Sequence, residues 1–550
     1  MINLSQYKAS FKGDLTGGLT AAIIALPMGL AFGLQSGLGP EAGLYTAIIL
    51  AIIASLIAGT KTLISDPTGP MTIVAAGIIA KAGIDTDSGI AMIIVTFALA
   101  GLFQIAFGFI KVAQYVKYIS YPVLSGFMGG IGIIIILFQW HSFFGEKTPG
   151  KVLDIISHLP DPIIHHHWSA IILGVVTLFL IYTIPLISKK IPAGLIALTL
   201  GTLASLALKE YSFIGDWHFD TIGNIPNQLP EIQLGFLESF DYSQLSVVIV
   251  SALTLAGLGT IDTLLTSVVA DNITKTKHNG NRELMGQGLG NLVTALFGGI
   301  PGAGSTTGTV SNINSNGTTN LSGIFKGVFL LIVLLGLGKY LSIVPKPVLS
   351  ALLISVGIGI IDFKGIKRLI KIKNSDTLVL ILVISLTVFA DLLVAVGVGM
   401  VLSSFFFMQR MGEIVEEQSK KGNLSEVEKK LKVPEAIKNR VFNYELDGPL
   451  FYGFSDQFKA QAEAIKDKDA VIINMSHVPY IDASGIYVLE EVISGFKSKN
   501  IEVVLVGVKD HIFKQFEDLE VIPKTLPEEN AYNSVRAGVK YLKNKLQDEL

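Results

Sequence analysis

The sequence has no cysteine and few charged residues. None of its 550 residues is Cys, and Asp, Glu, Lys and Arg together make up only 16%. Without cysteine, the chain forms no disulfide, thiolate metal site or cysteine nucleophile. Globular domains carry about a quarter charged residues, so this low share and a mean hydropathy of +0.57 indicate a membrane protein. The net charge of −2 favours no nucleic-acid partner.

Charge is scarcest in residues 1–410, which hold only 23 of the 42 Lys and Arg residues. Apolar stretches recur there that approach or exceed the roughly 20 helical residues needed to cross a hydrocarbon core. We predict fourteen membrane segments, at 15–34, 41–58, 68–82, 88–110, 119–144, 168–187, 192–208, 245–271, 282–300, 305–314, 322–338, 345–361, 376–389 and 391–410. A charged linker, 411–435, and a soluble domain, 436–550, are expected to follow.

The third and tenth segments are too short to cross a membrane as helices. Each follows a piece rich in Gly and Pro, at 65–70 and 299–304. Broken segments at matching places in two halves indicate an inverted repeat with a substrate site near the bilayer midplane. The sequence therefore predicts a polytopic α-helical membrane protein built as a 7+7 inverted repeat.

The distribution of basic residues predicts the orientation. With a cytoplasmic N-terminus, the inner loops hold seventeen of the 23 Lys and Arg residues, Lys326 among them, and the outer loops hold six. This difference follows the positive-inside rule. Fourteen segments return the soluble domain to the cytoplasm, so we expect a cell (inner) membrane protein with both termini cytoplasmic.

The two breaks predict an anion site. A helix that begins in mid-membrane has four N–H groups without intrahelical partners and a positive dipole end. Two such ends suit a small oxyanion. Neutral hydroxyl donors lie beside them, from Thr68 and Thr72 in one half and from Ser305, Thr306 and Thr307 in the other.

Asp262 lies inside the apolar segment 245–271. An intramembrane carboxylate is costly and marks a functional candidate. Thr266 is four residues further on, so both side chains leave the same helix face and offer oxygen ligands to a hard cation. The alternative is a carboxylate satisfied by neighbouring hydroxyls.

Several stretches resemble one known family, and the resemblance covers nearly the whole chain. They are Ala25–Phe32, Pro67–Thr72, Asp262–Asp271, Asn281–Asn291 and Pro301–Gly304. The chain resembles the SulP anion transporters (solute carrier family 26), and within them the BicA-type sodium–bicarbonate symporters. The resemblance implies a UraA-like fold, in which a core of segments 1–4 and 8–11 moves like an elevator against a gate of segments 5–7 and 12–14. A homodimer is expected.

The resemblance also implies ligands. The positions that match the sodium site of the BicA type are Asp262, Thr266, Gly304, Ser305 and Thr306. The positions that match its bicarbonate site are Thr68, Ser305 and Thr306. Asp66 stands where that type has glycine, and a charged carboxylate there would repel an anion. Gly308 stands where many family members have arginine, which leaves a bound cation as the countercharge.

The C-terminal domain has an α/β pattern. Strands are predicted at 441–446, 470–475 and 501–506, and a helix opens near Ile481–Gly485, where Asp482 or Ser484 could cap it. This resembles the STAS fold, whose soluble members are phosphorylated at the serine that matches Ser484. Ser484 is therefore a regulatory candidate, and helix capping is the simpler explanation.

The expected function is sodium-coupled bicarbonate uptake. We expect no enzymatic activity and no cofactor beyond a coupled sodium ion. Proton-coupled transport of sulfate or a related anion is an alternative, as is an anion channel or a sensor that signals through the STAS domain.

Overall fold

The computed structural model describes residues 4–547 except 150–151, 166, 189–191, 211–219, 224, 226–228, 234–237, 373, 391, 422–439, 452–457, 461, 464 and 466–467. The chain divides into two compact units, Met1–Ser403 and Ser404–Leu550. Residues 422–435 of the expected linker lie outside the described residues. The first eleven linker residues continue the last membrane helix, α17 (Leu392–Lys421).

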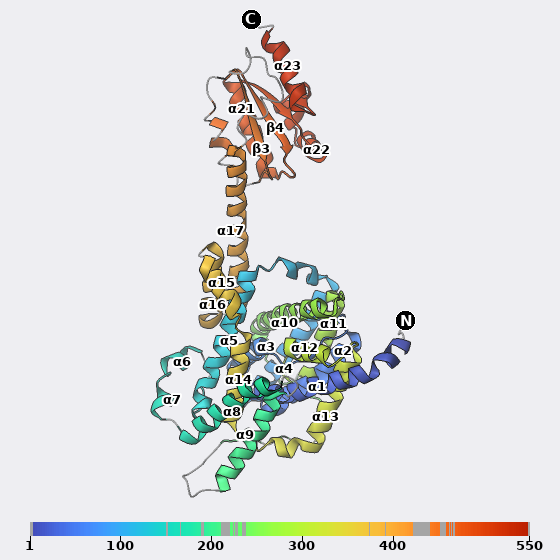
Figure 1. Ribbon diagram of the computed structural model, residues 1–550, viewed down its shortest axis with the longest axis vertical. Helices are drawn as coiled ribbons and strands as arrows, with labels where there is room; N and C mark the ends of the chain where they lie inside the picture. Colours follow the sequence, from blue (N-terminus) through green and yellow to red (C-terminus); the bar gives the residue numbers. More distant parts are fainter. Residues whose placement is uncertain are drawn as a thin grey trace. The chain divides into compact units, whose positions relative to one another are not determined.

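Eight helices of the first unit, four from each half, pack against one another (Figure 1). Those of the first half are α1 (Leu4–Ser36), α2 (Pro40–Ile57), α3 (Gly69–Ala82) and α4 (Asp87–Phe109). Those of the second half are α10 (Leu245–Thr274), α11 (Gly280–Leu296), α12 (Thr306–Asn314) and α13 (Leu321–Leu341). The helix α11 packs on α4 and α2, and α13 packs on α1 and α2. This group, called the core below, contains the segments expected to form a core.

The remaining long helices form a second group, called the gate below, around α5 (Tyr121–Phe143) and α14 (Lys346–Ile360). The others are α8 (Trp168–Ile187), α9 (Ala193–Glu210), α16 (Ser375–Phe389) and α17. Short elements connect the long helices: η1 (Val112–Tyr118), α6 (Val152–Ser157), α7 (Asp161–Ile164), η4 (Tyr242–Gln244) and α15 (Phe363–Ile372). The helices α1 and α3 bridge the two groups, because α1 contacts α9 and α14 and α3 contacts α5.

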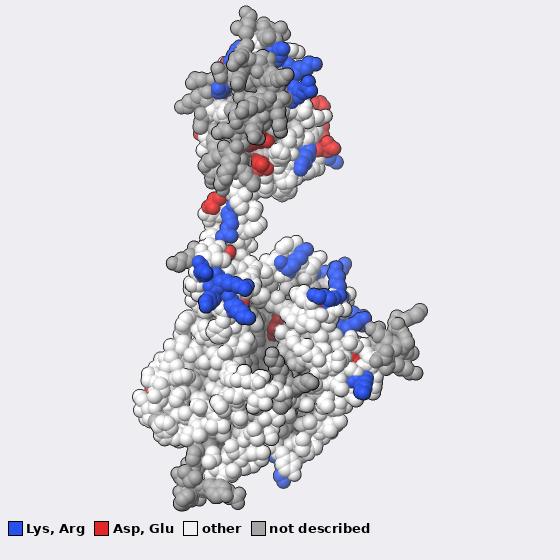
Figure 2. All heavy atoms as spheres, in the orientation of Figure 1, with Lys and Arg blue, Asp and Glu red and all other residues white. Residues whose placement is uncertain are grey.

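Each predicted membrane segment coincides with one helix. Among the described residues, nine helices are long and apolar enough to cross a membrane, and three shorter ones are also apolar. The number of crossings stays a prediction. Figure 2 shows blue Lys and Arg side chains gathered at the end of this unit where α15 lies, as a positive-inside orientation expects.

The two breaks meet in a short antiparallel ladder. Strand β1 (Ser65–Asp66) pairs with β2 (Ala303–Gly304), with Ser65 opposite Gly304 and Asp66 opposite Ala303. The approach requires glycine at 302, because a Cβ atom there would lie 2.5 Å from the Asp66 carbonyl oxygen. Helix α3 begins shortly after β1 and α12 shortly after β2, so one ladder positions both half-helices.

The second unit contains a four-stranded sheet in the order β3–β4–β5–β6, with all neighbours parallel. The strands are β3 (Val441–Asp447), β4 (Ala470–His477), β5 (Glu502–Val506) and β6 (Ala531–Tyr532). The helical elements are α21 (Ala483–Ser498), α22 (Asp510–Asp518), η5 (Val521–Thr525), η6 (Glu528–Asn530) and α23 (Val535–Gln547). The three predicted strands are confirmed, and the two-residue strand β6 was not predicted.

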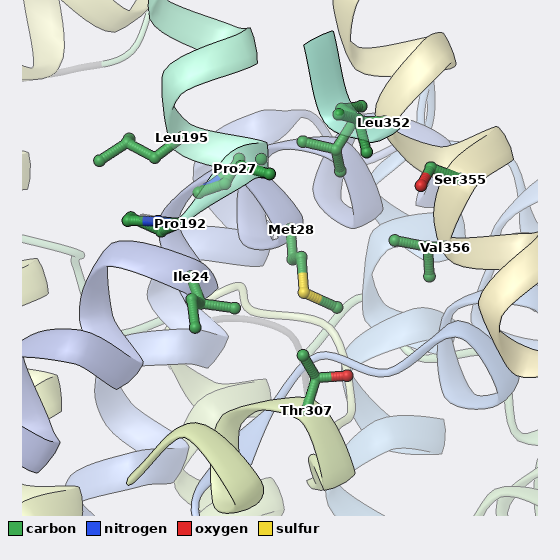
Figure 3. Close-up of a pocket in the computed structure, with 12 residues that line it drawn as sticks. Ile24, Pro27, Met28, Pro192, Leu195, Thr307, Leu352, Ser355 and Val356 are labelled. Atoms are coloured by element: carbon green, nitrogen blue, oxygen red, sulfur yellow. The ribbon is translucent and has the colours of Figure 1, made fainter. Parts of the chain in front are cut away.

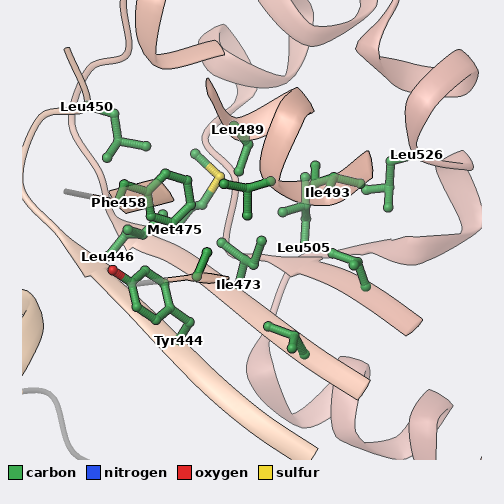
Figure 4. Packing of buried hydrophobic residues seen from close by; sticks show 14 of the residues in the cluster. Tyr444, Leu446, Leu450, Phe458, Ile473, Met475, Leu489, Ile493, Leu505 and Leu526 are labelled. Carbon is green, nitrogen blue, oxygen red and sulfur yellow. The ribbon is translucent and has the colours of Figure 1, made fainter. Parts of the chain in front are cut away.

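Both faces of this sheet are covered. Val471, Ile473 and Met475 point into a core that includes Leu489 and Ile493 of α21 (Figure 4). Neighbouring residues of the same strand point to the other face, where Leu542 and Leu546 of α23 cover them. Side chains alternate between the faces of a strand, so a strand covered on both sides is mostly apolar. Residues 470–475 are apolar except for Asn474.

Asp482, and not Ser484, caps helix α21. The Asp482 carboxylate accepts a hydrogen bond from the Gly485 amide at 2.8 Å. The explanation of Ser484 as the helix cap is therefore wrong, since Asp482 already satisfies this helix start. Ser484 lies one residue inside the helix and is half-buried, and its modification stays a prediction.

Candidate anion and cation site

The start of α3 leaves donors without intrahelical partners. Thr68 is its N-cap and forms no capping bond, and Pro70 has no N–H. The first amide bonded within this helix is that of Thr72, which donates to the Thr68 carbonyl at 2.9 Å. The amides of Gly69 and Met71 come before it and have no carbonyl within the helix to which they could donate. The Thr68 and Thr72 hydroxyls are buried. The Thr68 hydroxyl faces the Asp262 carboxylate, and no other described residue gives either hydroxyl a hydrogen-bond partner.

At the start of α12, more of the polar groups are already hydrogen-bonded to the protein. Ser305 is its N-cap; its hydroxyl accepts from the Gly308 amide at 3.2 Å, and its own amide donates to the Ile64 carbonyl at 2.7 Å. The Thr309 amide donates to the Ser305 carbonyl. The amides of Thr306 and Thr307 thus remain as the first-turn donors. Both residues are exposed.

Asp262 and Thr266 project toward this place from α10. The Thr266 hydroxyl donates to the Gly304 carbonyl at 2.9 Å and lies 2.8 Å from the Thr306 hydroxyl. The Asp262 carboxylate lies beside Thr68, and its Oδ2 atom is buried without a hydrogen-bond partner among the described residues. One carboxylate, hydroxyls and a carbonyl are oxygen ligands suited to a hard cation.

The structure thus brings the predicted site residues together but gives them different roles. Asp262 lies beside Thr68, whereas Thr266, one turn further along α10, contacts Gly304 and Thr306. Ser305 differs from the prediction, because its amide and hydroxyl already bond to the protein. Thr307, predicted only as a hydroxyl donor beside the second break, also supplies the second free amide of α12.

Lys326 corrects the sequence analysis. It does not lie in an inner loop but inside α13, where it is fully buried. Its ammonium forms an ion pair with Asp66 and donates to the carbonyls of Ala47 at 2.7 Å and Ser65 at 2.9 Å. Asp66 is therefore paired and does not stand alone beside the anion site. The signal was in the sequence, since Lys326 falls inside the predicted segment 322–338.

Two polar residues of α11 hold the breaks in shape. Asn291 accepts from the Gly302 amide at 2.8 Å and donates to its carbonyl at 3.0 Å, which satisfies the backbone before β2. Glu283 accepts from the Gly59 and Thr60 amides at 2.8 and 2.7 Å after α2. Non-helical backbone at membrane depth needs such internal partners.

A cavity of about 250 Å³ lies between the core and the gate (Figure 3). Thr307 lines it from α12, and Ile24, Pro27 and Met28 line it from α1. The gate contributes apolar residues of α9 and α14, together with the Ser355 hydroxyl. The exposed first turn of α12 therefore borders a hollow at the boundary between the two groups of helices.

Residues 11–383 match the model of the sulfate permease family, and residues 433–537 match that of the STAS domain. The first match covers more than half of the chain. The chain belongs to the sulfate permease family. It is a multi-pass membrane transporter of that family and carries a C-terminal STAS domain.

Known proteins resemble this chain over most of its length. The bicarbonate transporter BicA of Synechocystis is 39% identical over 492 residues, which cover 88% of this chain and 85% of BicA. The solved transmembrane domain of a cyanobacterial BicA covers 70% of this chain and 97% of that domain, with 44% identity and a TM-score of 0.64. The structure of murine Solute Carrier 26 family member A9 in the inward-facing state matches 97% of this chain and 91% of its own, with a TM-score of 0.82. At 18% identity, this match shows the shared fold alone.

Proposed function

We propose that this protein takes up bicarbonate together with a sodium ion. The observation that carries the proposal is the buried Asp262 carboxylate, whose Oδ2 atom has no close hydrogen bond among the described residues and whose one polar neighbour there is the Thr68 hydroxyl. Bicarbonate is proposed because the BicA transporters share 38–39% of their residues with this chain.

The charges around the site support a bound cation. Asp66 is neutralised by Lys326, so Asp262 is the uncompensated charge among the described site residues. An anion placed between the starts of α3 and α12 would meet this carboxylate. A sodium ion held by Asp262, Thr266 and the Gly304 carbonyl removes that repulsion, and each ion then raises the affinity for the other.

The division into core and gate supports an elevator movement. The proposed ligands, on α3, α10, β2 and α12, all belong to the core, whereas the wall of the cavity opposite Thr307 belongs to the gate. The core carries the site past the gate as one body. We further propose a homodimer in the cell membrane with both termini in the cytoplasm, as the basic end near α15 favours.

Uptake of labelled bicarbonate and labelled sulfate into proteoliposomes tests the proposal. With an inward sodium gradient, bicarbonate should accumulate, and replacement of sodium by potassium should stop the accumulation. Accumulation that follows a pH gradient and ignores sodium would establish proton coupling instead. Sulfate uptake without bicarbonate uptake would overturn the proposed substrate.

Electrical measurements should show a nearly neutral cargo. One sodium ion with one bicarbonate carries no net charge, so the membrane potential does no work on it, against about 2.3 kcal/mol per charge per 100 mV otherwise. The sodium gradient alone then supplies about 1.4 kcal/mol per tenfold ratio. On a solid-supported membrane, sodium and bicarbonate together should produce little steady current. A sustained inward positive current would mean more than one sodium ion per anion.

A further inference from the structure

The Asp66–Lys326 pair has a defined direction in the core. The Lys326 ammonium uses its three donors on the Ala47 carbonyl, the Ser65 carbonyl and Asp66 Oδ1. These partners belong to α2 and β1. The positive end of the pair is thereby enclosed by α2, β1 and α13.

The negative end faces the start of α12. Asp66 Oδ2 lies 3.2 Å from the point that a Cβ atom on Gly308 would occupy, and the Ser305 hydroxyl lies 3.3 Å from the same point. Ser305 is the N-cap of α12 and Gly308 belongs to its first turn. A side chain at 308 would therefore be in tight contact with the Asp66 carboxylate.

A carboxylate at this place opposes an anion and favours a cation. The N-terminal end of a helix attracts negative charge, and Asp66 already supplies part of it to α12. The pair as a whole is neutral, but its negative end lies nearer to α12, and this end repels an anion in proportion to the anion's own charge. A divalent oxyanion therefore loses more binding free energy than a monovalent one. A sodium ion on nearby Gly304 and Thr306 binds more tightly instead.

We propose that the Asp66–Lys326 pair is a specificity-determining pair, which makes the site reject divalent anions and admit a monovalent anion only together with a cation. The pair acts on the anion through the field at the start of α12 and does not touch the substrate. Lys326 is the positioning residue, because it holds Asp66 Oδ1 and leaves Oδ2 directed at α12. This inference rests on the proposed function.

Asp66→Asn tests the proposal with little change of shape. The asparagine oxygen still accepts from Lys326, but the negative end of the pair is gone and the ammonium remains. The ratio of sulfate uptake to bicarbonate uptake should rise at least about tenfold, because like-charge repulsion no longer suppresses the divalent ion. The sodium concentration that gives half-maximal bicarbonate uptake should also change. In addition, a substantial part of the bicarbonate uptake should no longer depend on sodium.

The double variant Asp66→Asn/Lys326→Met separates charge from structure. It removes both ends of the pair, so its sulfate-to-bicarbonate ratio should lie between those of the wild type and Asp66→Asn. A purely structural ion pair predicts the wild-type ratio in both variants, with a change only in thermal stability. If Asp66→Asn does not reach the membrane, the double variant alone decides, because a wild-type ratio there overturns the proposal.

The exposed ion pair between Asp220 and Lys346, 3.3 Å apart, provides the matched control. Asp220→Asn/Lys346→Met removes the same two charges far from the half-helices in sequence and should leave the ratio unchanged. Wild-type bicarbonate uptake with unchanged ratios in the Asp66 variants would overturn this inference alone. A wild-type protein that transports no anion would overturn the proposed function, and this inference with it.

Discussion

Asp262→Asn should abolish sodium-dependent uptake while the protein still folds and inserts. The substitution keeps the shape of the side chain and removes its charge. Loss of one partner from a buried charge pair costs roughly 2–5 kcal/mol, which corresponds to about thirty- to several-thousand-fold in sodium affinity. Uptake of labelled bicarbonate into proteoliposomes over a sodium titration measures the effect.

Asp85→Asn is the matched control, because Asp85 is an exposed carboxylate between α3 and α4. It loses the same charge and should transport as the wild type does. Unchanged sodium dependence in Asp262→Asn would show that the cation is held elsewhere. Sodium-independent uptake at the full wild-type rate would show that Asp262 serves only to impose coupling.

Thr68→Val should weaken anion binding more than it slows turnover. Valine has nearly the shape of threonine, so the substitution removes only the buried hydroxyl, which faces the Asp262 carboxylate and has no other partner among the described residues. A hydrogen bond to a charged group contributes about 1.5–3 kcal/mol, so KM for the anion should rise roughly ten- to hundredfold. Concentration-dependent uptake at saturating sodium separates KM from the maximal rate.

Thr96→Val controls for the loss of a buried hydroxyl in the same group of helices. The Thr96 hydroxyl donates to the Met92 carbonyl of its own helix, α4, so its removal should leave KM unchanged. A wild-type KM in Thr68→Val would place the anion away from the start of α3. The two amides of α12 would then be the remaining donors among those proposed here.

Local sequence patterns predicted the breaks and the residues beside them. Pro67, Pro70 and Gly302 disrupt apolar segments that otherwise cross, and this effect needs no knowledge of the fold. Asp262 and Thr266 are four residues apart, so helical geometry alone places them on one face. The strand at 470–475 was predicted from a run of apolar residues that suits a strand buried on both faces.

Pairings between the two halves of the repeat were not predictable in the same way. Asp66 and Lys326 are 260 residues apart. Asp66 lies in the first break and Lys326 inside the predicted segment 322–338, and neither position alone indicates the other. The occupied amide of Ser305 follows from its bond to the Ile64 carbonyl, which exists only once the ladder has formed. The free donors at a helix start therefore depend on a partner strand that local patterns do not identify.

The ladder between β1 and β2 also bears on how the protein is made. Ser65 pairs with Gly304, so the chain must be synthesised through the second break before the first acquires its partner. Until then, Lys326 and Asn291 have not fixed their neighbours, and the polar backbone around β1 has no internal acceptors at membrane depth. The first half consequently stays incompletely packed, in the bilayer or at its surface, until the second half has been synthesised. Release of the nascent chain before residue 326 should leave a fragment that quality-control proteases recognise.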